Sequence, residues 1–299
     1  MSLRPGFLII DKPTGATSFS MVSLVRRLAG VRRVGHAGTL DPLASGVLPI
    51  AVGAATRLIE YLDDAPKTYA AVVRLGAATT TFDAEGEVTE ARDASGIGRH
   101  EIEAALGEFV GEIEQVPPRY SALKVAGKPM YAYAREGTDV APAARRVRID
   151  SIRVLGYANP DLEFEVVCGK GTYIRSLAHD LGARLGCGAH LAALRRTASG
   201  GFTLEDTHAP DDLISVQARG EFEELLLAPD RAVERRPAAI FASAPTAAIV
   251  AGRDVSLPSD SRANVCRAYS VSGEFLGVLA PLGSGRWHPE KVLLPSQKG

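Results

Sequence analysis

A single aspartate, Asp41, lies in a loop whose neighbours are small. Residues 35–50 read GHAGTLDPLASGVLPI, so Asp41 precedes Pro42 and is followed by an apolar run. An aspartate before a proline is most often a turn-former or a helix cap. Small residues around it would also let the backbone of another molecule approach the carboxylate. These small residues are Gly35, Gly38, Ala44 and Gly46.

The same glycines could instead form a phosphate-binding loop. Residues 35–46 lack the lysine and the spacing of a P-loop, and Gly169–Thr172, with the sequence GKGT, has only its last few letters. Neither stretch therefore supports nucleotide hydrolysis.

Three further residues could take part in chemistry at Asp41. Arg175 lies in the first turn of an expected helix, where the helix macrodipole disfavours a cation. A carboxylate partner would compensate, and the guanidinium fork could hold that carboxylate ionised and in one orientation. A surface arginine that reaches water fits the segment equally well. Tyr69 and Tyr173 fit half-buried structural positions, but an aromatic ring can equally stack on a flipped base.

The elements that would position these residues follow from hydrophobic periodicity and turn signals. Helices are expected over 18–29, with Ser18 as N-cap and Gly30 as stop, and over 55–62, 100–109 and 173–185. Strands are expected over 6–10, 47–52, 68–75, 87–90, 146–155 and 162–168, with a turn at 83–86 and another short strand reached through 190–197. Because strands and helices do not alternate regularly, the predicted fold class is α+β with a mixed, largely antiparallel central sheet.

Two segments differ from this pattern. Residues 117–142 show no hydrophobic periodicity and contain four prolines and three tyrosines. This composition indicates a long functional loop or an inserted subdomain. After Pro237, short apolar runs alternate with glycines, as they would in a small β domain. We therefore expect two domains, over 1–237 and 238–299.

Composition excludes several classes of protein. The 299 residues are 46% hydrophobic and 23% charged, which is typical of a globular protein. No apolar run approaches 18 residues, so no membrane span is expected. The N-terminal apolar run of four residues is too short for a signal peptide, and we expect a cytoplasmic protein. The three cysteines have no paired spacing, which argues against disulfides and a zinc site.

Charge is distributed unevenly although the net charge is only −1. Residues 22–36 carry four arginines and no acid, and residues 117–153 have a net charge of +5. Residues 205–236 have a net charge of −5. The two basic stretches could share a face that attracts a phosphate backbone. Solvated surface charge is the simpler explanation for either stretch alone.

Several motifs occur together over residues 6 to about 205. They are Asp11-Lys12-Pro13, GHAGTLDPLASGVLP, Lys67-Thr68-Tyr69, PPRYSALKVAGKPMYAYAREG, KGTYIRSLAHDLG and CGAHLAALRRT. In this order they resemble the bacterial TruB-type tRNA pseudouridine-55 synthases, and the GTLDPLASG string is highly specific.

The resemblance implies roles for individual residues. Asp41 matches the family's catalytic aspartate, and Arg175 matches the arginine that forms a salt bridge with it. Tyr69 matches the tyrosine that stacks on the target base and is proposed to move the C5 proton. The substrate-binding positions implied are Lys12, His36, Gly38, Thr39, Lys124, Tyr173 and Leu194.

The resemblance also implies a pseudouridine-synthase fold and an RNA partner. Residues 117–142 would be the thumb that folds over a tRNA T-arm stem-loop, and residues 238–299 would be a PUA-like RNA-binding domain. The reaction would isomerise uridine 55, and since no atom is gained or lost, it requires no cofactor or metal. The protein is expected to act as a monomer.

Three questions stay open at this point. A single carboxylate could attack C1′, attack C6 of the ring, or remove a proton from C2′. A guide-dependent rRNA pseudouridine synthase subunit and an RNA-binding chaperone of tRNA folding are the alternative functions. The thumb-like insert and the lack of a lysine-rich tail favour the stand-alone enzyme over the guided subunit.

Overall fold

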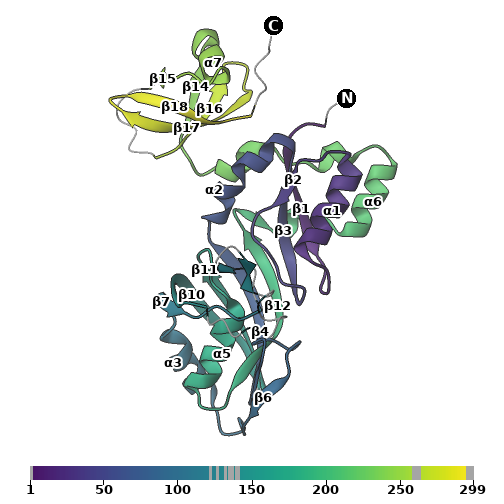
Figure 1. Ribbon diagram of the computed structural model, residues 1–299, viewed down its shortest axis with the longest axis vertical. Coiled ribbons are helices and arrows are strands. Elements are labelled where there is room, and N and C mark those ends of the chain that lie inside the picture. The colour runs from purple at the N-terminus through teal and green to yellow at the C-terminus, as the bar shows by residue number, and fades with distance from the viewer. Residues whose placement is uncertain are drawn as a thin grey trace.

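The computed structural model of the protein describes residues 3–120, 123–125, 128–130, 133, 138, 142–257 and 264–293. Within these residues the chain forms a large mixed sheet flanked by helices and a smaller sheet at one end of an elongated molecule (Figure 1). Much of the predicted thumb, 117–142, lies outside the described residues. The part that is described includes a short ladder of β8 (Lys124–Val125) with β9 (Lys128–Pro129).

The central sheet contains nine strands. Its order is β1 (Gly6–Lys12), β3 (Ala44–Val52), β12 (Ala189–Ser199), β4 (Lys67–Leu75), β11 (Asp161–Cys168), β10 (Arg145–Ala158) and β7 (Gly111–Gln115), while β2 (Val34–His36) pairs with β3 and β13 (Phe202–Thr203) with β12. The β12–β3 pair is parallel and the other pairs of this sheet are antiparallel. The predicted mixed, largely antiparallel sheet is therefore confirmed.

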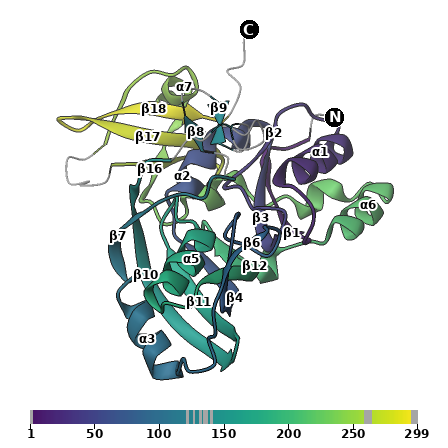
Figure 2. The ribbon, with the colours of Figure 1, turned by 60° about the horizontal axis from the view of Figure 1, so that its bottom comes forward.

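Helices cover both halves of the sheet. The helix α1 (Ser18–Ala29) and the helix α6 (Pro210–Ala218) pack beside β1 and β3, whereas α3 (Arg99–Gly107) and α5 (Ile174–Arg184) pack beside the other half (Figures 1 and 2). The remaining elements of this part are η1 (Gly53–Leu58), α2 (Ile59–Asp63), β5 (Ala77–Thr79), β6 (Val88–Ala91), η2 (Leu204–Asp206), η3 (Phe222–Leu225) and η4 (Pro229–Val233). Among the described helices, none is long and apolar enough to cross a bilayer.

Local sequence explains most element boundaries. In β4 the residues Tyr69, Ala71 and Val73 are buried and alternate with less buried neighbours, as a half-covered strand requires. The helix α1 ends at Gly30, whose φ of 65° is the left-handed conformation that glycine adopts readily. The N-cap is Thr17, whose hydroxyl accepts a hydrogen bond from Ser20 N, and the prediction of Ser18 was wrong by one residue.

The strand near residue 190 was also predicted to be shorter than it is. The strand β12 runs over eleven residues in the middle of the sheet, between β3 and β4. Two register shifts in its pairing with β4 interrupt the alternation of buried and exposed side chains along β12. A search for strict alternation therefore underestimated the length of this strand.

The smaller sheet begins at Ala238. Its order is β14 (Ala238–Phe241), β16 (Cys266–Ser270), β17 (Phe275–Gly283), β18 (Arg286–Val292) and β15 (Val255–Ser256), and α7 (Ser243–Val250) packs against it. The alternating pattern did not predict α7. The assignment of 238–299 as a PUA-like RNA-binding domain stays a prediction.

The smaller sheet is joined to the large one by side chains of η1 and α2. The Arg57 guanidinium donates to the Val292 carbonyl at 2.5 Å, and the Tyr61 hydroxyl donates to Glu290 at 3.1 Å. Apolar residues of both parts, including Leu58 and Val278, form one buried cluster beneath these contacts. The segment that leads into β4 is thus fixed against the smaller sheet.

Candidate active site

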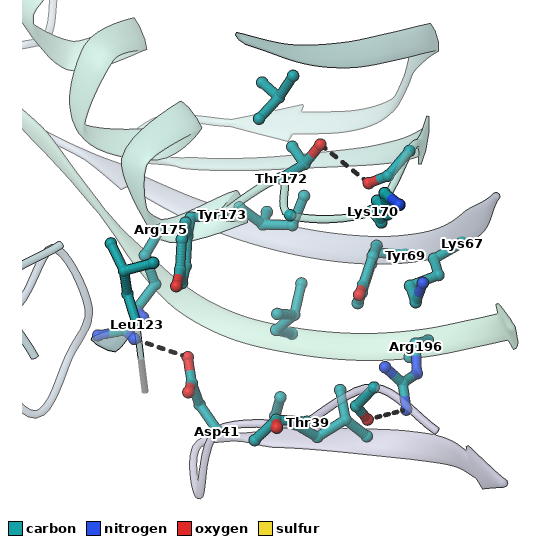
Figure 3. Close-up of a pocket in the computed structure, with 18 of the residues that line it drawn as sticks. Thr39, Asp41, Lys67, Tyr69, Leu123, Lys170, Thr172, Tyr173, Arg175 and Arg196 are labelled. Carbon is teal, nitrogen blue, oxygen red and sulfur yellow. Dashed lines mark hydrogen bonds and ion pairs between the residues drawn. The ribbon is translucent and has the colours of Figure 1, made fainter. Parts of the chain in front are cut away.

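The loop that carries Asp41 joins β2 to β3 and is fastened from several elements. The hydroxyl of Ser18 donates to the Leu40 carbonyl at 3.0 Å and accepts from Leu40 N at 2.9 Å. The Pro42 carbonyl accepts a hydrogen bond from Gly15 N at 2.8 Å. The loop therefore holds its backbone fixed while the Asp41 side chain, 40% exposed, projects toward a cavity (Figure 3).

Two glycines near Asp41 serve packing inside the protein. A Cβ at Gly46 would lie 2.2 Å from the Arg196 carbonyl oxygen on β12, and φ at Gly46 is 100°. A Cβ at Gly35 would lie 3.1 Å from Ile59 Cδ1. The interpretation that these glycines admit a substrate was wrong, because the close approach is made by other residues of the same chain. Gly38, with φ of 76°, does line the cavity.

Arg175 lies between two carboxylates. Its side chain is only 5% exposed, and its Nη2 lies 2.8 Å from Asp41 Oδ2 while its Nη1 lies 3.3 Å from Asp83 Oδ2. The carbonyls of Thr81 and Tyr120 accept further hydrogen bonds from the guanidinium, at 3.2 and 2.8 Å. These partners compensate the charge at a helix N-terminus that the macrodipole disfavours.

Asp83 is a site residue that the sequence reasoning missed. It is 3% exposed, and its Oδ1 accepts hydrogen bonds from the Thr81 hydroxyl at 2.5 Å and from Glu85 N at 3.1 Å. The residue before it, Phe82, has a φ of 64°, a conformation that costs a non-glycine residue about 1–3 kcal/mol. The sequence signalled only a turn at 83–86, and nothing local indicated a buried ion pair.

Tyr69 faces Arg196 across the β4–β12 ladder, in which the two residues are paired. Arg196 is fully buried, and its guanidinium donates to the Val47 carbonyl at 2.7 Å and to the Gly38 carbonyl at 3.1 Å. It thus ties both ends of the Asp41 loop to β12. Burial raises the pKa of the Tyr69 phenol, and the positive charge of Arg196 opposes this increase.

Tyr173 and Leu194 form the apolar side of the site. Tyr173 is the N-cap residue of α5, and its backbone N–H and carbonyl are hydrogen-bonded to the Gln115 side chain at 2.8 and 3.0 Å. The Arg145 guanidinium lies over the Tyr173 ring, 4.6 Å from its centroid. Leu194 is partly buried on β12, opposite Ala44 of β3. Both residues line the cavity.

The cavity has a volume of about 610 Å³. Its walls include seven of the predicted site residues together with five further basic residues (Figure 3). The predicted ones that line it are Gly38, Thr39, Asp41, Tyr69, Tyr173, Arg175 and Leu194, and the further basic ones are Lys67, Arg145, Arg146, Lys170 and Arg196. Arg145 and Arg146 belong to the basic stretch noted in the sequence, whereas Lys67 and Lys170 occur in the motifs quoted above but were given no role there. A cavity of this size with cations at its rim can hold a nucleotide and its phosphates.

Three predicted substrate-binding residues are placed elsewhere or not described. Lys12 is fully buried behind the Asp41 loop, where its Nζ donates to the carbonyls of Pro13 and Ala16 at 3.0 and 2.6 Å. Burial lowers the pKa of Lys12 to about 8. His36 is half-buried on β2 opposite Ile50 and does not line the cavity. The side chain of Lys124 lies outside the described residues, although Leu123 lines the cavity.

Within the described residues, no group of three or more His, Cys, Asp or Glu side chains could hold a metal ion. All three cysteines are buried and free.

Family models match residues 26–234 of this chain, and known proteins match nearly its whole length. Residues 26–174 match the N-terminal domain of the TruB family pseudouridylate synthases, and residues 175–234 match the tRNA pseudouridylate synthase B C-terminal domain. A tRNA pseudouridine synthase B of Dehalococcoides mccartyi is 42% identical over 289 residues, which cover 97% of this chain and 96% of the relative. The chain belongs to the TruB family of pseudouridylate synthases.

Other relatives agree with the TruB assignment. A tRNA pseudouridine synthase B of Chromobacterium violaceum is 44% identical over 290 residues, covering 96% of this chain and 94% of the relative. A solved Cbf5-Nop10-Gar1 complex contains a chain with a TM-score of 0.76 and 29% identity, covering 97% of this TruB family chain and 85% of that chain. A chain of an H/ACA RNP bound to a substrate RNA has a TM-score of 0.75 and 26% identity, with 98% and 86% coverage.

Proposed function

We propose that this chain converts uridine to pseudouridine at position 55 in the T-loop of tRNA, with Asp41 as the catalytic carboxylate. The observation that carries the proposal is the Asp41–Arg175 pair. It joins a half-exposed carboxylate to a buried guanidinium at 2.8 Å in the wall of a cavity that can accept a nucleotide. The names of the relatives, tRNA pseudouridine synthase B, support the substrate class.

The reaction breaks the N1–C1′ glycosidic bond, rotates the detached uracil, forms a C5–C1′ bond, and moves the proton of C5 to solvent or to N1. Atoms balance without a second reactant. The Asp41 carboxylate can attack C1′ or C6, or take the C2′ proton, and the ion pair with Arg175 holds it in position for each of these roles. The family resemblance assigns the C5 proton to the Tyr69 hydroxyl, whose pKa is raised by burial while the positive charge of Arg196 opposes this increase.

Substrate binding requires the base to leave its stack in the T-loop. Extrusion costs a few kcal/mol, which stacking on Tyr69 and contacts to the backbone can offset. The basic residues Arg145, Arg146 and Lys170, which line the cavity and are at least partly exposed, offer these backbone contacts. A glycosidase would need a second carboxylate to activate water. Among the described residues that line the cavity, Asp41 is the one that carries a carboxylate. Asp83 is paired with Arg175 and does not line the cavity.

A second candidate is modification of other RNA in a guided complex. It is favoured by the likeness to chains of the Cbf5-Nop10-Gar1 complex and the H/ACA RNP. The identity to those chains is 29% and 26%, against 42% and 44% for the tRNA pseudouridine synthases. The higher identity favours the stand-alone function.

The experiment is to map pseudouridine in total tRNA and in a T-arm stem-loop after incubation with the purified chain alone. One new pseudouridine at position 55 of both RNAs supports the proposal. Product only after addition of a guide RNA and partner proteins would assign the guided function instead. Tight binding and refolding of tRNA without any product would assign the chaperone function.

A further inference from the structure

The aromatic rings of Phe82 and His179 form a stack directly behind the catalytic ion pairs. Their centroids are 3.9 Å apart and the ring planes are inclined by only 13°. His179 lies on α5 four residues after Arg175, so the two side chains project from the same face of the helix, one turn apart. Phe82 immediately precedes Asp83, the buried partner of Arg175. The turn over 79–83 therefore contacts α5 at two places, by an ion pair and by a ring stack.

Phe82 adopts a backbone conformation that its side chain does not favour. Among the described residues, Phe82 and Ser284 are the non-glycine residues with positive φ. The Phe82 carbonyl accepts a hydrogen bond from Leu191 N at 3.0 Å, and Ala84 N, two residues later, donates to the Leu191 carbonyl at 2.9 Å. The backbone is thus fixed to β12 on both sides of Asp83. A bulky residue keeps such a backbone conformation only where several contacts with the surrounding structure hold it in place.

His179 contributes the flat face of its ring to this contact. Its Nδ1 is buried and has no hydrogen-bond partner among the described residues. A buried ring nitrogen without a partner is costly, so hydrogen bonding through Nδ1 does not explain a histidine here. The stack with Phe82 is the interaction that the ring makes.

We propose that Phe82 and His179 are positioning residues that set the turn over 79–83 against α5 and thereby orient Arg175 toward Asp41. The Arg175 Nη1 donates hydrogen bonds to Asp83 Oδ2 and to the Thr81 carbonyl, both from this turn, while Nη2 pairs with Asp41. A shift of the turn along α5 would rotate the guanidinium and move Nη2 from the carboxylate. This inference rests on the proposed function, because the orientation matters only if Asp41 does the chemistry.

The test compares His179→Ala with His179→Phe in single turnover on a T-arm stem-loop. His179→Ala should lower the rate constant at least about tenfold while the Kd for the RNA stays within about threefold, since neither ring lines the cavity. His179→Phe keeps the stack and removes the unsatisfied nitrogen, so it should stay within about threefold of wild type in rate. His100→Ala, on the exposed face of α3, is the matched control and should leave the rate unchanged.

Two further variants separate positioning from folding. Phe82→Gly relieves the backbone strain but removes the ring, and it should lose activity like His179→Ala without a lower unfolding midpoint. In the double variant Asp83→Asn with His179→Ala, the combined loss should be smaller than the product of the single losses, because both act through Arg175.

Several outcomes overturn the inference. They are an unchanged rate in His179→Ala, an equal loss in His179→Phe, a loss that follows the unfolding midpoint, or multiplied losses in the double variant. If wild type forms pseudouridine and any of these is found, this inference alone fails. If wild type forms none on either RNA, the proposed function fails as well.

Discussion

Asp41 and Asp83 are bound by different nitrogens of the same guanidinium, although they lie 42 positions apart in the chain and differ greatly in exposure. The side chain of Asp41 is 40% exposed, whereas the side chain of Asp83 is 5% exposed. The buried carboxylate balances the charge of Arg175 permanently, so the exposed carboxylate can exchange partners with a substrate without leaving an unpaired buried cation.

Asp83→Asn tests this division of roles. The amide keeps the shape of the side chain but removes the charge that holds Arg175 Nη1, so Arg175 should turn toward Asp41 and solvent. We expect pseudouridine formation to slow by about tenfold to a hundredfold with little change in RNA affinity, and the free energy of unfolding to fall by roughly 1–3 kcal/mol. Single-turnover rates and urea denaturation measure the two effects.

Asp161→Asn is the matched control for Asp83→Asn. It removes one charge from the exposed ion pair with Arg74, at 2.8 Å, and should change stability by less than about 1 kcal/mol and activity not at all. Equal effects of the two variants would contradict a special role for Asp83.

Asp41→Asn tests the proposed catalytic carboxylate itself. The change leaves the loop contacts of Leu40 and Pro42 intact, so the protein should fold and should bind a T-arm stem-loop within about tenfold of wild type. Pseudouridine formation should fall by at least about a thousandfold, because the amide is neither a nucleophile nor a base. Turnover retained near the wild-type rate would refute the role of Asp41.

The sequence predicted the features that depend on local periodicity and on local charge. The alternation of β4 and the glycine stop of α1 were sufficient to place both elements. The position of Arg175 in the first turn of a helix suggested a carboxylate partner but fitted a surface arginine equally well, and the family resemblance decided between the two. The resemblance named Asp41 as this partner. In the structure, Arg175 Nη2 lies 2.8 Å from Asp41 Oδ2.

The features that the sequence did not predict depend on contacts between distant segments. Asp83 in the string DAEG fits a turn completely, and only the fold brings it to Arg175, 92 positions later. From the sequence, Gly46 was interpreted as a residue that lets a substrate approach. In the structure the Arg196 carbonyl packs against Gly46, and it belongs to another strand, so the local sequence did not indicate it. Lys12 matches a family motif, but a motif does not say whether a side chain faces the cavity or the loop behind it.

Lys12→Met tests the structural position of this lysine. The pKa of Lys12 falls from 10.5 to about 8 on folding, chiefly because the side chain is buried. Between these values the unfolded chain binds more protons at this position than the folded chain does, so the contribution of Lys12 to stability increases as the pH rises. The variant lacks this titration. Its deficit in free energy of unfolding should therefore be larger at about pH 9.5 than at about pH 7.5.

The activity of Lys12→Met separates the two roles considered for the residue. If Lys12 only holds the loop that carries Asp41, the KM for RNA should stay within about threefold of wild type while kcat falls with the loss of loop order. An increase in KM with an unchanged kcat would instead indicate that Lys12 binds the substrate.

Leu58→Ala tests how the smaller sheet is attached. Leu58 is fully buried in the cluster that also contains Val278 and Leu293 of the smaller sheet. Its truncation should lower the free energy of unfolding by about 2–5 kcal/mol. Lys291→Ala removes a partly exposed ion pair with Glu60 at the same junction and should cost less than about 1 kcal/mol. Calorimetry should show one transition that moves in Leu58→Ala; a second, unmoved transition would show that the smaller sheet unfolds independently.

Arg146→Ala tests the basic rim as a phosphate site. Arg146 is exposed and lines the cavity, whereas Arg99 is exposed on α3, pairs with Glu103 at 2.7 Å and does not line it. A lost phosphate contact should weaken RNA binding at low salt and reduce the slope of log K against log salt by about 0.7–0.9. Titrations of the T-arm stem-loop at several salt concentrations give both quantities. Arg99→Ala should leave the slope unchanged, and an equal reduction in both variants would mean that overall charge, rather than a site at the rim, sets the affinity.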